Sequence, residues 1–275
     1  MQEVLWRQKI IFPFLNFSFE CHFCLASLSC ESLEIWGKNY LHPLEFWEHE
    51  NLTNKRRKHD YLLRNYCVKQ VILPCLKKPL NYAKHLHISK EINQQAFLMS
   101  DRIYHSHLQI SITHSETLGF AVAFEGLYPL GIDIEKINLQ KFQSIESLMT
   151  SEEKGLTKDF IHTKELNAII LWTAKEALCK AVGGGLSVFS EITQVIGIFS
   201  NQSYTEILFK HLSGYRAYSF LFEDYIITIA FPYTKRFEID LHPIWKKLKE
   251  DMKLSIQSPN FWHESLNERK RAVNS

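Results

Sequence analysis

One short segment of the sequence places two acids where they could share a cation. Gly131–Glu135 reads GIDIE, so acid alternates with isoleucine. A period of two is typical of a half-buried strand, and it predicts that Asp133 and Glu135 project from one face while the isoleucines project from the other. Two carboxylates on one strand face are candidate ligands for a single metal ion.

A second segment adds a third acid and a pair of lysines. Trp172–Lys180 reads WTAKEALCK and is rich in helix formers. Glu176 and Lys180 are four apart, so a helix would make them neighbours on one face, at about 5–6 Å between Cβ atoms. A metal ligand would then lie beside an ammonium group that binds phosphate. Together the two segments predict a phosphoryl-group transferase that acts on a metal-bound diphosphate.

Length and composition narrow the class of protein. The 275 residues are 45% hydrophobic and 23% charged, with a formal net charge of +2. Such a chain can build one large domain or two modest ones, and it has no overall basic field that would favour nucleic acid. The densest basic cluster within the body of the chain is Lys55–Lys58. Six cysteines do not make a disulfide framework in a chain this long, so we expect reduced thiols and a cytoplasmic location. The chain has no long apolar run, so we expect no membrane span.

Sequence periodicity predicts the following elements. Strands are expected over 33–40, 108–112, 118–124, 130–134, 191–199, 204–209, 215–221 and 225–231, and helices over 54–73, 150–158 and 164–181. The strands 118–124 and 130–134 are joined by a short Gly-containing segment, which predicts an antiparallel hairpin. Residues 77–105 are expected to be loop with short elements, and a polar helix with a charged tail closes the chain.

The order strand, helix, strands occurs once on each side of about residue 125. This order predicts an α+β fold of two similar halves packed side by side, with a site for a large ligand between them. The expected divisions are an N-terminal extension (1–32, outside the main fold or an added first strand), an N-terminal half (33–125), a C-terminal half with the acidic motifs (126–235) and a helical tail (236–275).

The motifs resemble a known family. GIDIE at 131–135, WTAKEALCK at 172–180 and ITHS at 112–115 are similar to the signature segments of the Sfp-type 4′-phosphopantetheinyl transferases. Glu176 follows Asp133 by 43 residues, which fits the spacing of about forty in that family. The resemblance covers roughly residues 54–231 and implies the pseudo-dimeric α+β fold of that superfamily.

The resemblance also implies an activity. Members of the family transfer the phosphopantetheine arm of coenzyme A to a serine of an acyl or peptidyl carrier protein and release adenosine 3′,5′-bisphosphate. Asp133, Glu135 and Glu176 would bind magnesium, and Lys180 would contact a bridging phosphate. Thr113 and His114 would approach the 3′-phosphate or ribose of coenzyme A, and Lys175 would contact a further phosphate.

Two segments depart from the family pattern. Relatives often have an arginine early in the first long helix that binds the adenosine phosphate, whereas counting back from Tyr61 puts Lys58 there, next to Arg57. Lysine offers a point charge in place of a planar fork. Many relatives also carry Gly-Lys-Pro before the histidine motif, where this chain reads Gln95–Met99. Lys90 or Arg102 would have to supply that phosphate contact.

The chemistry of the side chains supports these roles independently. Carboxylate oxygens suit Mg²⁺, which binds a few acids together with substrate phosphates. Attack by a serine hydroxyl needs a base, and Glu176 is the candidate, acting directly or through a metal-bound water. We expect a monomer that docks its carrier protein near the helix containing Trp172 and the loop after Gly183. The sequence leaves open which carrier pathway the chain serves.

Two other functions remain open from the sequence. A metal-dependent nuclease with a D…(D/E)xK core also combines an acid pair with Glu and Lys, but it needs the last two residues two apart on a strand. A carrier-binding module that has lost its transfer activity would keep the fold without the chemistry. Glu176 and Lys180 could also be a simple exposed ion pair, although their position relative to GIDIE argues for a shared site.

Overall fold

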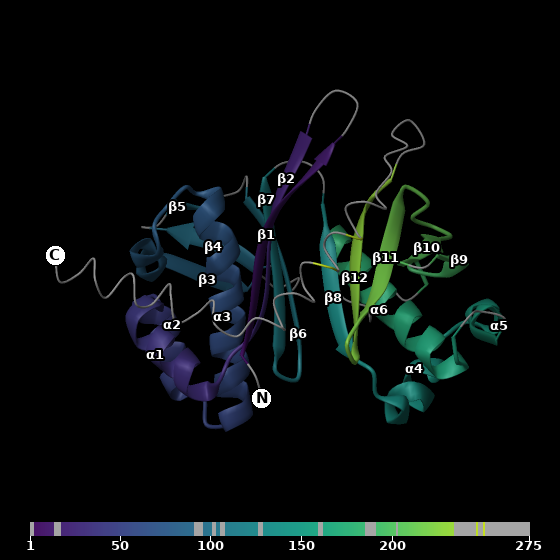
Figure 1. The fold of residues 1–275 in the computed structure, drawn as a ribbon, viewed down its shortest axis with the longest axis horizontal. Coiled ribbons are helices and arrows are strands. Elements are labelled where there is room, and N and C mark those ends of the chain that lie inside the picture. Colours follow the sequence, from purple (N-terminus) through teal and green to yellow (C-terminus); the bar gives the residue numbers. More distant parts are fainter. Residues whose placement is uncertain are drawn as a thin grey trace.

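Two antiparallel sheets form the centre of the molecule, with helices on the outside of each (Figure 1). The computed structural model describes residues 3–13, 18–90, 96–100, 103–104, 108–125, 129–158, 162–184, 191–201 and 203–233, with the single positions 246 and 250. The expected α+β class is confirmed. Apart from those two positions, the expected helical tail (236–275) lies outside the described residues.

The first half contains a larger sheet with its helices on one face. Its strands are β1 (Val4–Pro13), β2 (Ser18–Ser27), β3 (Leu86–Lys90), β4 (Ala96–Ser100), β5 (Ile103–Tyr104), β6 (Leu108–Ser115) and β7 (Leu118–Glu125). Its helices are α1 (Cys30–Tyr40), α2 (Pro43–Asn51), α3 (Lys55–Cys75) and the 3-10 helix η1 (Leu80–His85). The strands lie in the order β1-β2-β7-β6-β4-β3, and β5 pairs with β4.

The second half repeats this plan. Its helices are η2 (Leu139–Lys141), α4 (Phe142–Ser147), α5 (Ser151–Lys158) and α6 (Lys164–Val182), and its strands are β8 (Gly131–Lys136), β9 (Val195–Ser200), β10 (Thr205–Phe209), β11 (Tyr215–Phe222) and β12 (Tyr225–Pro232). The strand order is β8-β12-β11-β10-β9. This order matches β2-β7-β6-β4-β3 of the first sheet once β1 is set aside.

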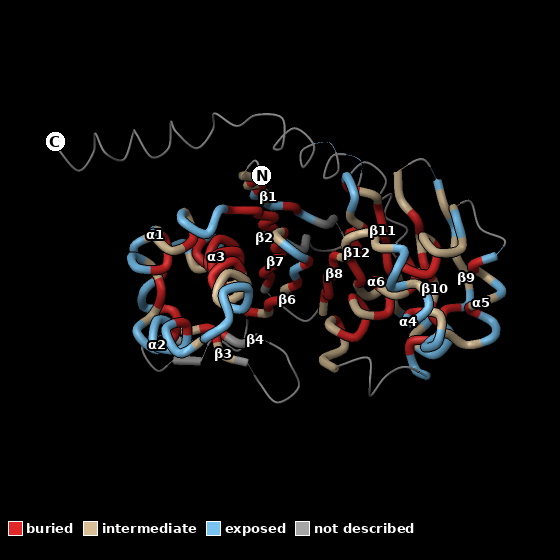
Figure 2. Tube along the Cα trace, turned by 90° about the horizontal axis from the view of Figure 1, so that it is seen from below, coloured by how far each residue is buried: buried red, intermediate tan, exposed pale blue. Residues whose placement is uncertain are grey.

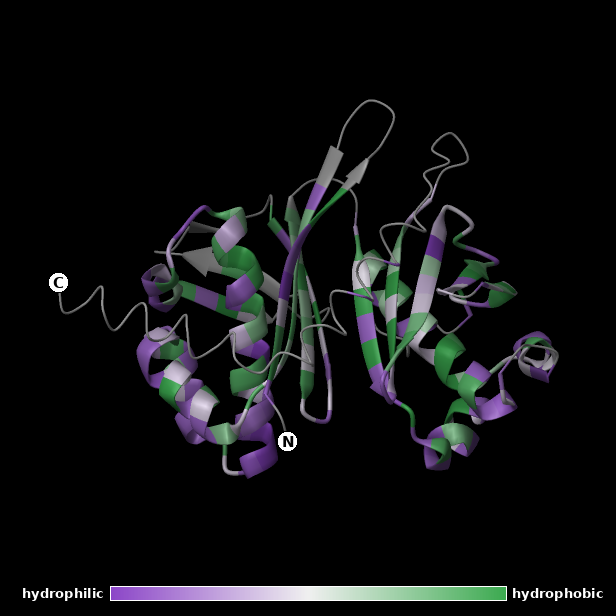
Figure 3. Ribbon diagram, in the orientation of Figure 1, coloured by the Kyte–Doolittle hydropathy of each residue, from purple (hydrophilic) through white to green (hydrophobic). Residues whose placement is uncertain are grey.

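The apolar residues form three layers of core between these elements. One core lies between the two sheets and contains Phe23, Phe120 and Ile132. The second lies between the first sheet and α1 and α3, and the third lies between the second sheet and α6. Buried segments accordingly follow the strands and the inner sides of α3 and α6 (Figure 2), where hydrophobic residues also concentrate (Figure 3). The layers run helix, sheet, sheet, helix.

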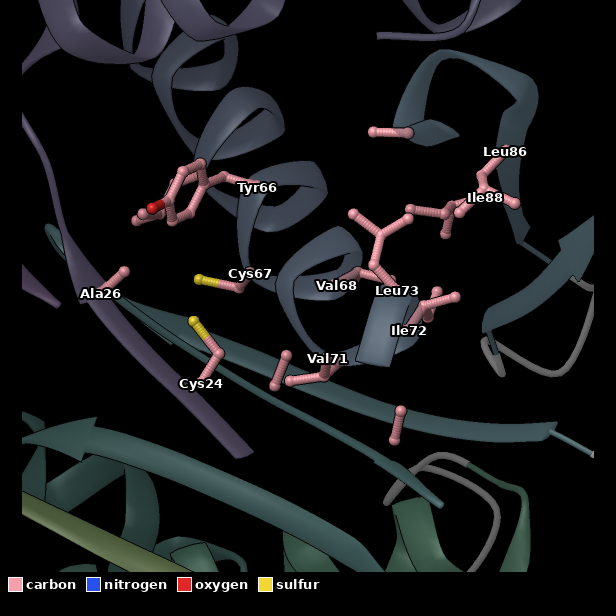
Figure 4. Close-up of a cluster of buried hydrophobic side chains, with 14 of the residues drawn as sticks. Cys24, Ala26, Tyr66, Cys67, Val68, Val71, Ile72, Leu73, Leu86 and Ile88 are labelled. Atoms are coloured by element: carbon pink, nitrogen blue, oxygen red, sulfur yellow. The ribbon is translucent and has the colours of Figure 1, made fainter. Parts of the chain in front are cut away.

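Helix α3 is capped and packed as its sequence predicts. Asn54 accepts a hydrogen bond from the backbone N–H of Arg57, which is a standard N-cap. Cys67 faces Cys24 of β2 across the second core (Figure 4). A Cβ added at Gly119 of β7 would lie 2.9 Å from the Cys67 sulfur, so the glycine allows the helix to approach the sheet.

Each half contains a buried glutamate–lysine pair that ties a short helix to the long one. In the first half, Lys69 Nζ lies 2.5 Å from Glu45 Oε2, and both side chains are fully buried. Burial lowers the pKa of Lys69, an effect that Glu45 partly offsets. In the second half, Lys175 Nζ lies 3.0 Å from Glu153 Oε1. Backbone N–H groups of Ile88 and Val195 donate to the two glutamates, so each pair also holds the first strand after its long helix.

Two expectations about the elements are wrong. Residues 33–40 belong to α1, because Ser29 caps the helix and Leu33, Trp36 and Gly37 are buried at helical spacing. The expected hairpin of 118–124 with 130–134 does not form: β7 pairs with β6 and β2, whereas β8 pairs with β12 in the other sheet. Residues 77–105, expected to be loop with short elements, contain η1, β3, β4 and β5.

The N-terminal segment is part of the first sheet. β1 and β2 form an antiparallel hairpin, and β2 pairs with β7. The sequence allowed one added strand, and the structure has two. Cys21–Cys24 of β2 has the CxxC spacing found in some metal sites. The two cysteines lie on opposite faces of β2, in different cores, so they cannot chelate one ion. None of the helices in the described part of the chain is long and apolar enough to cross a membrane.

Candidate functional site

Strand β8 presents its acids as the alternation predicted. Ile132 and Ile134 are buried in the core between the sheets. Asp133 and Glu135 project from the opposite face, with side chains that are 8% and 17% exposed. Asp133 lies opposite Thr228 of β12. The two carboxylates therefore line the side of the second sheet that α6 covers.

A glycine brings α6 against this strand. A Cβ built on Gly131 would lie 1.9 Å from the Ala177 carbonyl oxygen and 2.5 Å from the Ala181 nitrogen. Both are backbone atoms, which cannot rotate out of the way. The glycine that opens the GIDIE motif is therefore required for the close packing that places α6 beside the acids of β8.

We expect Gly131→Ala to destabilise the protein by about 3 kcal/mol or more, because α6 must move as a whole away from β8. Urea denaturation would measure the loss. Gly155→Ala on α5 is the matched control, since no atom lies within 4 Å of its built Cβ, and in a helix it should stabilise by up to about 1 kcal/mol. Equal stability of the two variants would show that α6 does not depend on this contact.

The face of α6 toward β8 carries the second motif. The helix begins after Thr163, which accepts from the Leu166 N–H, and ends at Gly183 in the left-handed conformation (φ 81°). Lys180 Nζ lies 2.7 Å from Asp133 Oδ1. Burial raises the pKa of Glu176, Asp133 raises it further, Lys180 lowers it in part and Glu135 raises it. Glu176 is thus within electrostatic range of both acids of β8.

Because residues 164–182 form a helix, the nuclease interpretation loses its basis. That site needs Glu and Lys two apart on a strand, whereas Glu176 and Lys180 are four apart on α6.

The other neighbour of Asp133 comes from the first half. Thr113 Oγ1 of β6 donates to Asp133 Oδ1 at 2.8 Å. Alternate residues of β6 also accept hydrogen bonds from the outer edge of β8: Ser111, Thr113 and Ser115 accept from the backbone N–H groups of Ile132, Ile134 and Lys136 at 3.1, 3.4 and 3.0 Å. These three hydroxyls, which we call the hydroxyl ladder, join the two sheets at the acidic motif.

His114 points to the opposite side of β6, toward the start of α3. Its Nε2 lies 3.6 Å from Asp60 Oδ2, and its side chain is 44% exposed. Asp60 also lies near Arg56 and His59. The histidine motif and the basic first turns of α3 are therefore adjacent.

Arg57 and Lys58 lie in the first turn of α3, as predicted. Arg57 is exposed and Lys58 is partly exposed. Within the described residues neither side chain has an ion-pair partner. Both cations are available to an anionic ligand at the start of α3.

Lys175 does not join the other candidate residues. Its side chain is 6% exposed, and its ammonium is held by both oxygens of Glu153, at 3.0 and 3.2 Å. It faces α5 and β9 and not the acids of β8. The structure thus gives Lys175 a structural partner where the resemblance implied a phosphate contact.

Carboxylate oxygens are the type of ligand that magnesium prefers, although the carboxylates of β8 form ion pairs with lysines. Asp133 is paired with Lys180 and Glu135 with Lys141. Among the described residues, no three acids, histidines or cysteines are arranged to hold one ion. The like charges that raise the pKa of Glu176 are nevertheless the environment in which a divalent cation would be favourable. Joint chelation by Asp133, Glu135 and Glu176 stays a prediction.

Three contacts were not foreseen from the sequence. They are Thr113 on Asp133, Lys141 on Glu135 and Glu153 on Lys175. Only the last had a local signal: Thr150 and Glu153 form a capping box, with Thr150 N–H donating to Glu153 and Glu153 N–H donating to Thr150. The other two depend on how separate elements pack together.

A comparison with known proteins identifies the same region of the chain. Residues 129–230 match the family model of the 4′-phosphopantetheinyl transferase superfamily. The match runs from just before β8 to near the end of β12 and so includes Asp133, Glu135, Glu176 and Lys180. No curated protein matches the chain at significant similarity.

Proposed function

We propose that this chain transfers the 4′-phosphopantetheine arm of coenzyme A to a serine of an acyl or peptidyl carrier protein, with Mg²⁺, in the manner of the Sfp-type enzymes. The observation that carries the proposal is the meeting of Asp133 and Glu135 on β8 with Glu176 and Lys180 on α6, within the segment that matches the superfamily model. We further propose that the protein works as a cytoplasmic monomer.

Each group has a place in the proposed site. Asp133, Glu135 and Glu176 would hold Mg²⁺, which would neutralise charge on the diphosphate of coenzyme A. When coenzyme A binds, Lys180 and Lys141 would release their carboxylate partners and bind phosphate oxygens instead. Arg57, Lys58 and His114 would bind the 3′-phosphate, since the two cations lie in the first turn of α3 and His114 lies 3.6 Å from Asp60 of the next turn.

The chemical step needs one proton acceptor. The serine oxygen bonds to the phosphorus that carries pantetheine, and the bond from that phosphorus to the bridging oxygen breaks, which releases adenosine 3′,5′-bisphosphate. Glu176 would take the serine proton as the general base. Lys180 would stabilise the charge that develops on the leaving oxygen.

We infer that the two halves are copies of one unit. Beyond the shared strand order, each half has a buried Glu–Lys pair, and each last hairpin turns at a glutamate with positive φ, 52° at Glu116 and 51° at Glu223. Ala121 and Thr228 each follow these glutamates by five residues. Their strand partners, Cys24 and Asp133, therefore occupy equivalent positions.

This correspondence predicts one site per chain. Cys24 takes the place of Asp133 and, one residue after the buried lysine, Gln70 takes the place of Glu176. The first half therefore lacks these two acids. We expect calorimetric titration with Mg²⁺ to find one site per chain, and two equivalent sites would contradict the correspondence.

The function itself is tested by incubating the protein with coenzyme A, Mg²⁺ and a panel of apo carrier proteins, and by measuring the intact mass of each carrier. We expect one phosphopantetheine arm to be added to at least one carrier, and none when EDTA is present or when the acceptor serine is replaced by alanine. A carrier that binds but stays unmodified would favour a carrier-binding module without transfer activity.

A further inference from the structure

We propose that Thr113 is a positioning residue for Asp133, and that it reaches from the first half to turn this carboxylate toward the cation. The inference deepens the proposed function and rests on it. It assigns Thr113 a contact with a metal ligand in place of the contact with coenzyme A that the resemblance implied.

The contacts of Asp133 carry the inference. Thr113 Oγ1 and Lys180 Nζ both bind Oδ1, at 2.8 and 2.7 Å. Within the described part of the chain, Oδ2 has no hydrogen-bond partner. The Thr113 hydroxyl on Oδ1 fixes the rotation of the carboxylate and leaves its second oxygen for a metal ion. This contact would stay in place when Lys180 moves to a phosphate oxygen.

Thr113 differs from the other members of the hydroxyl ladder in this respect. Ser111 and Ser115 only accept from β8, at 3.1 and 3.0 Å. Thr113 accepts from Ile134 at a longer 3.4 Å and donates to Asp133 at 2.8 Å. The carboxylate is therefore its main partner, and the backbone contact is secondary.

Burial places Thr113 away from a ligand in solvent. Thr113 is 7% exposed, whereas the next residue, His114, is exposed and points to the other side of the strand. Thr113 would thus position the metal ligand Asp133, while His114 would bind the phosphate. A hydrogen-bonded partner of a metal ligand typically contributes 10–100-fold to metal affinity.

Three variants separate positioning from simple packing. Thr113→Val keeps the shape and removes the hydroxyl, Thr113→Ser restores it, and Ser111→Ala removes a member of the ladder that does not touch a carboxylate. Binding of Mg²⁺ is measured by calorimetry and binding of Mn²⁺ by electron paramagnetic resonance. We expect Thr113→Val to weaken both by about 10-fold or more, and the other two variants to bind within about twofold of the original chain.

The outcomes are distinct. Unchanged metal affinity in Thr113→Val, or an equal loss in Thr113→Val and Ser111→Ala, would overturn the inference, as would absence of metal binding in the original chain. Carrier modification is measured in parallel. If the original chain binds metal but modifies no carrier, the proposed function fails, and the comparison of variants still decides the role of Thr113.

Discussion

Replacing Glu176 by glutamine is expected to lower the rate of carrier modification by about 10²–10⁴-fold, because the amide cannot take the serine proton. Glutamine keeps the size of the side chain and can still hydrogen-bond, so binding of coenzyme A should persist. The rate constant is measured by intact mass at saturating carrier, and coenzyme A binding by calorimetry. Glu165→Gln in the first turn of the same helix is the matched control, and its rate should be unchanged.

The same substitution should stabilise the protein in the absence of divalent cations. The pKa of Glu176 is raised above 4.5 by burial and by Asp133, so its ionised form costs folding free energy. That cost is absent below pH 4.5, where the group is protonated in both folded and unfolded chains, and it grows as the pH rises through the folded pKa. Glu176→Gln should therefore melt at a higher temperature than the original chain at pH 7 with EDTA, and at nearly the same temperature at pH 4.

Two results would count against this account of Glu176. Undiminished turnover would remove it from the chemistry, and a melting temperature below that of the original chain at pH 7 would show that its carboxylate is stabilised in the fold. Higher stability together with lost activity is the combination expected for a site that holds like charges in place for a cation.

Local patterns in the sequence identified the parts of the site that depend on local structure. The alternation around Asp133 predicted its strand and face correctly, and the spacing of Glu176 and Lys180 predicted their helix, because both patterns are decided within a few residues. A local pattern also led to one wrong prediction, the strand over Leu33–Tyr40. Its apolar residues resemble a strand, while the Ser29 cap and packing against α3 make it a helix.

Contacts between separate elements could not be predicted from local sequence patterns. The β7–β8 hairpin was inferred from closeness along the chain, but the two strands belong to different sheets. The contact of Thr113 with Asp133 exists only because the edge of β8 lies against β6. Residue types therefore indicated the chemistry of the site, and the packing of the two halves determines which side chains touch.

Replacing Lys175 by methionine is expected to lower the free energy of unfolding by about 3–5 kcal/mol, because it leaves the buried carboxylate of Glu153 without its cation. Only the backbone N–H groups of Thr150 and Val195 would remain on that side chain. Lys69→Met in the first half is the matched control: its partner Glu45 is equally buried, so the loss should be similar. Urea denaturation measures both.

The double variant Glu153→Gln/Lys175→Met should recover much of the stability, since no buried charge then remains unpaired. A phosphate contact at Lys175 predicts a different result, in which Lys175→Met raises the KM for coenzyme A and leaves the unfolding free energy unchanged. Because Glu176 is the next residue on α6, the Glu153–Lys175 pair also fixes the helix that carries the proposed base. Lys175→Met should therefore reduce kcat as well as stability, whereas Lys69→Met, in the half without these acids, should reduce stability with little effect on kcat.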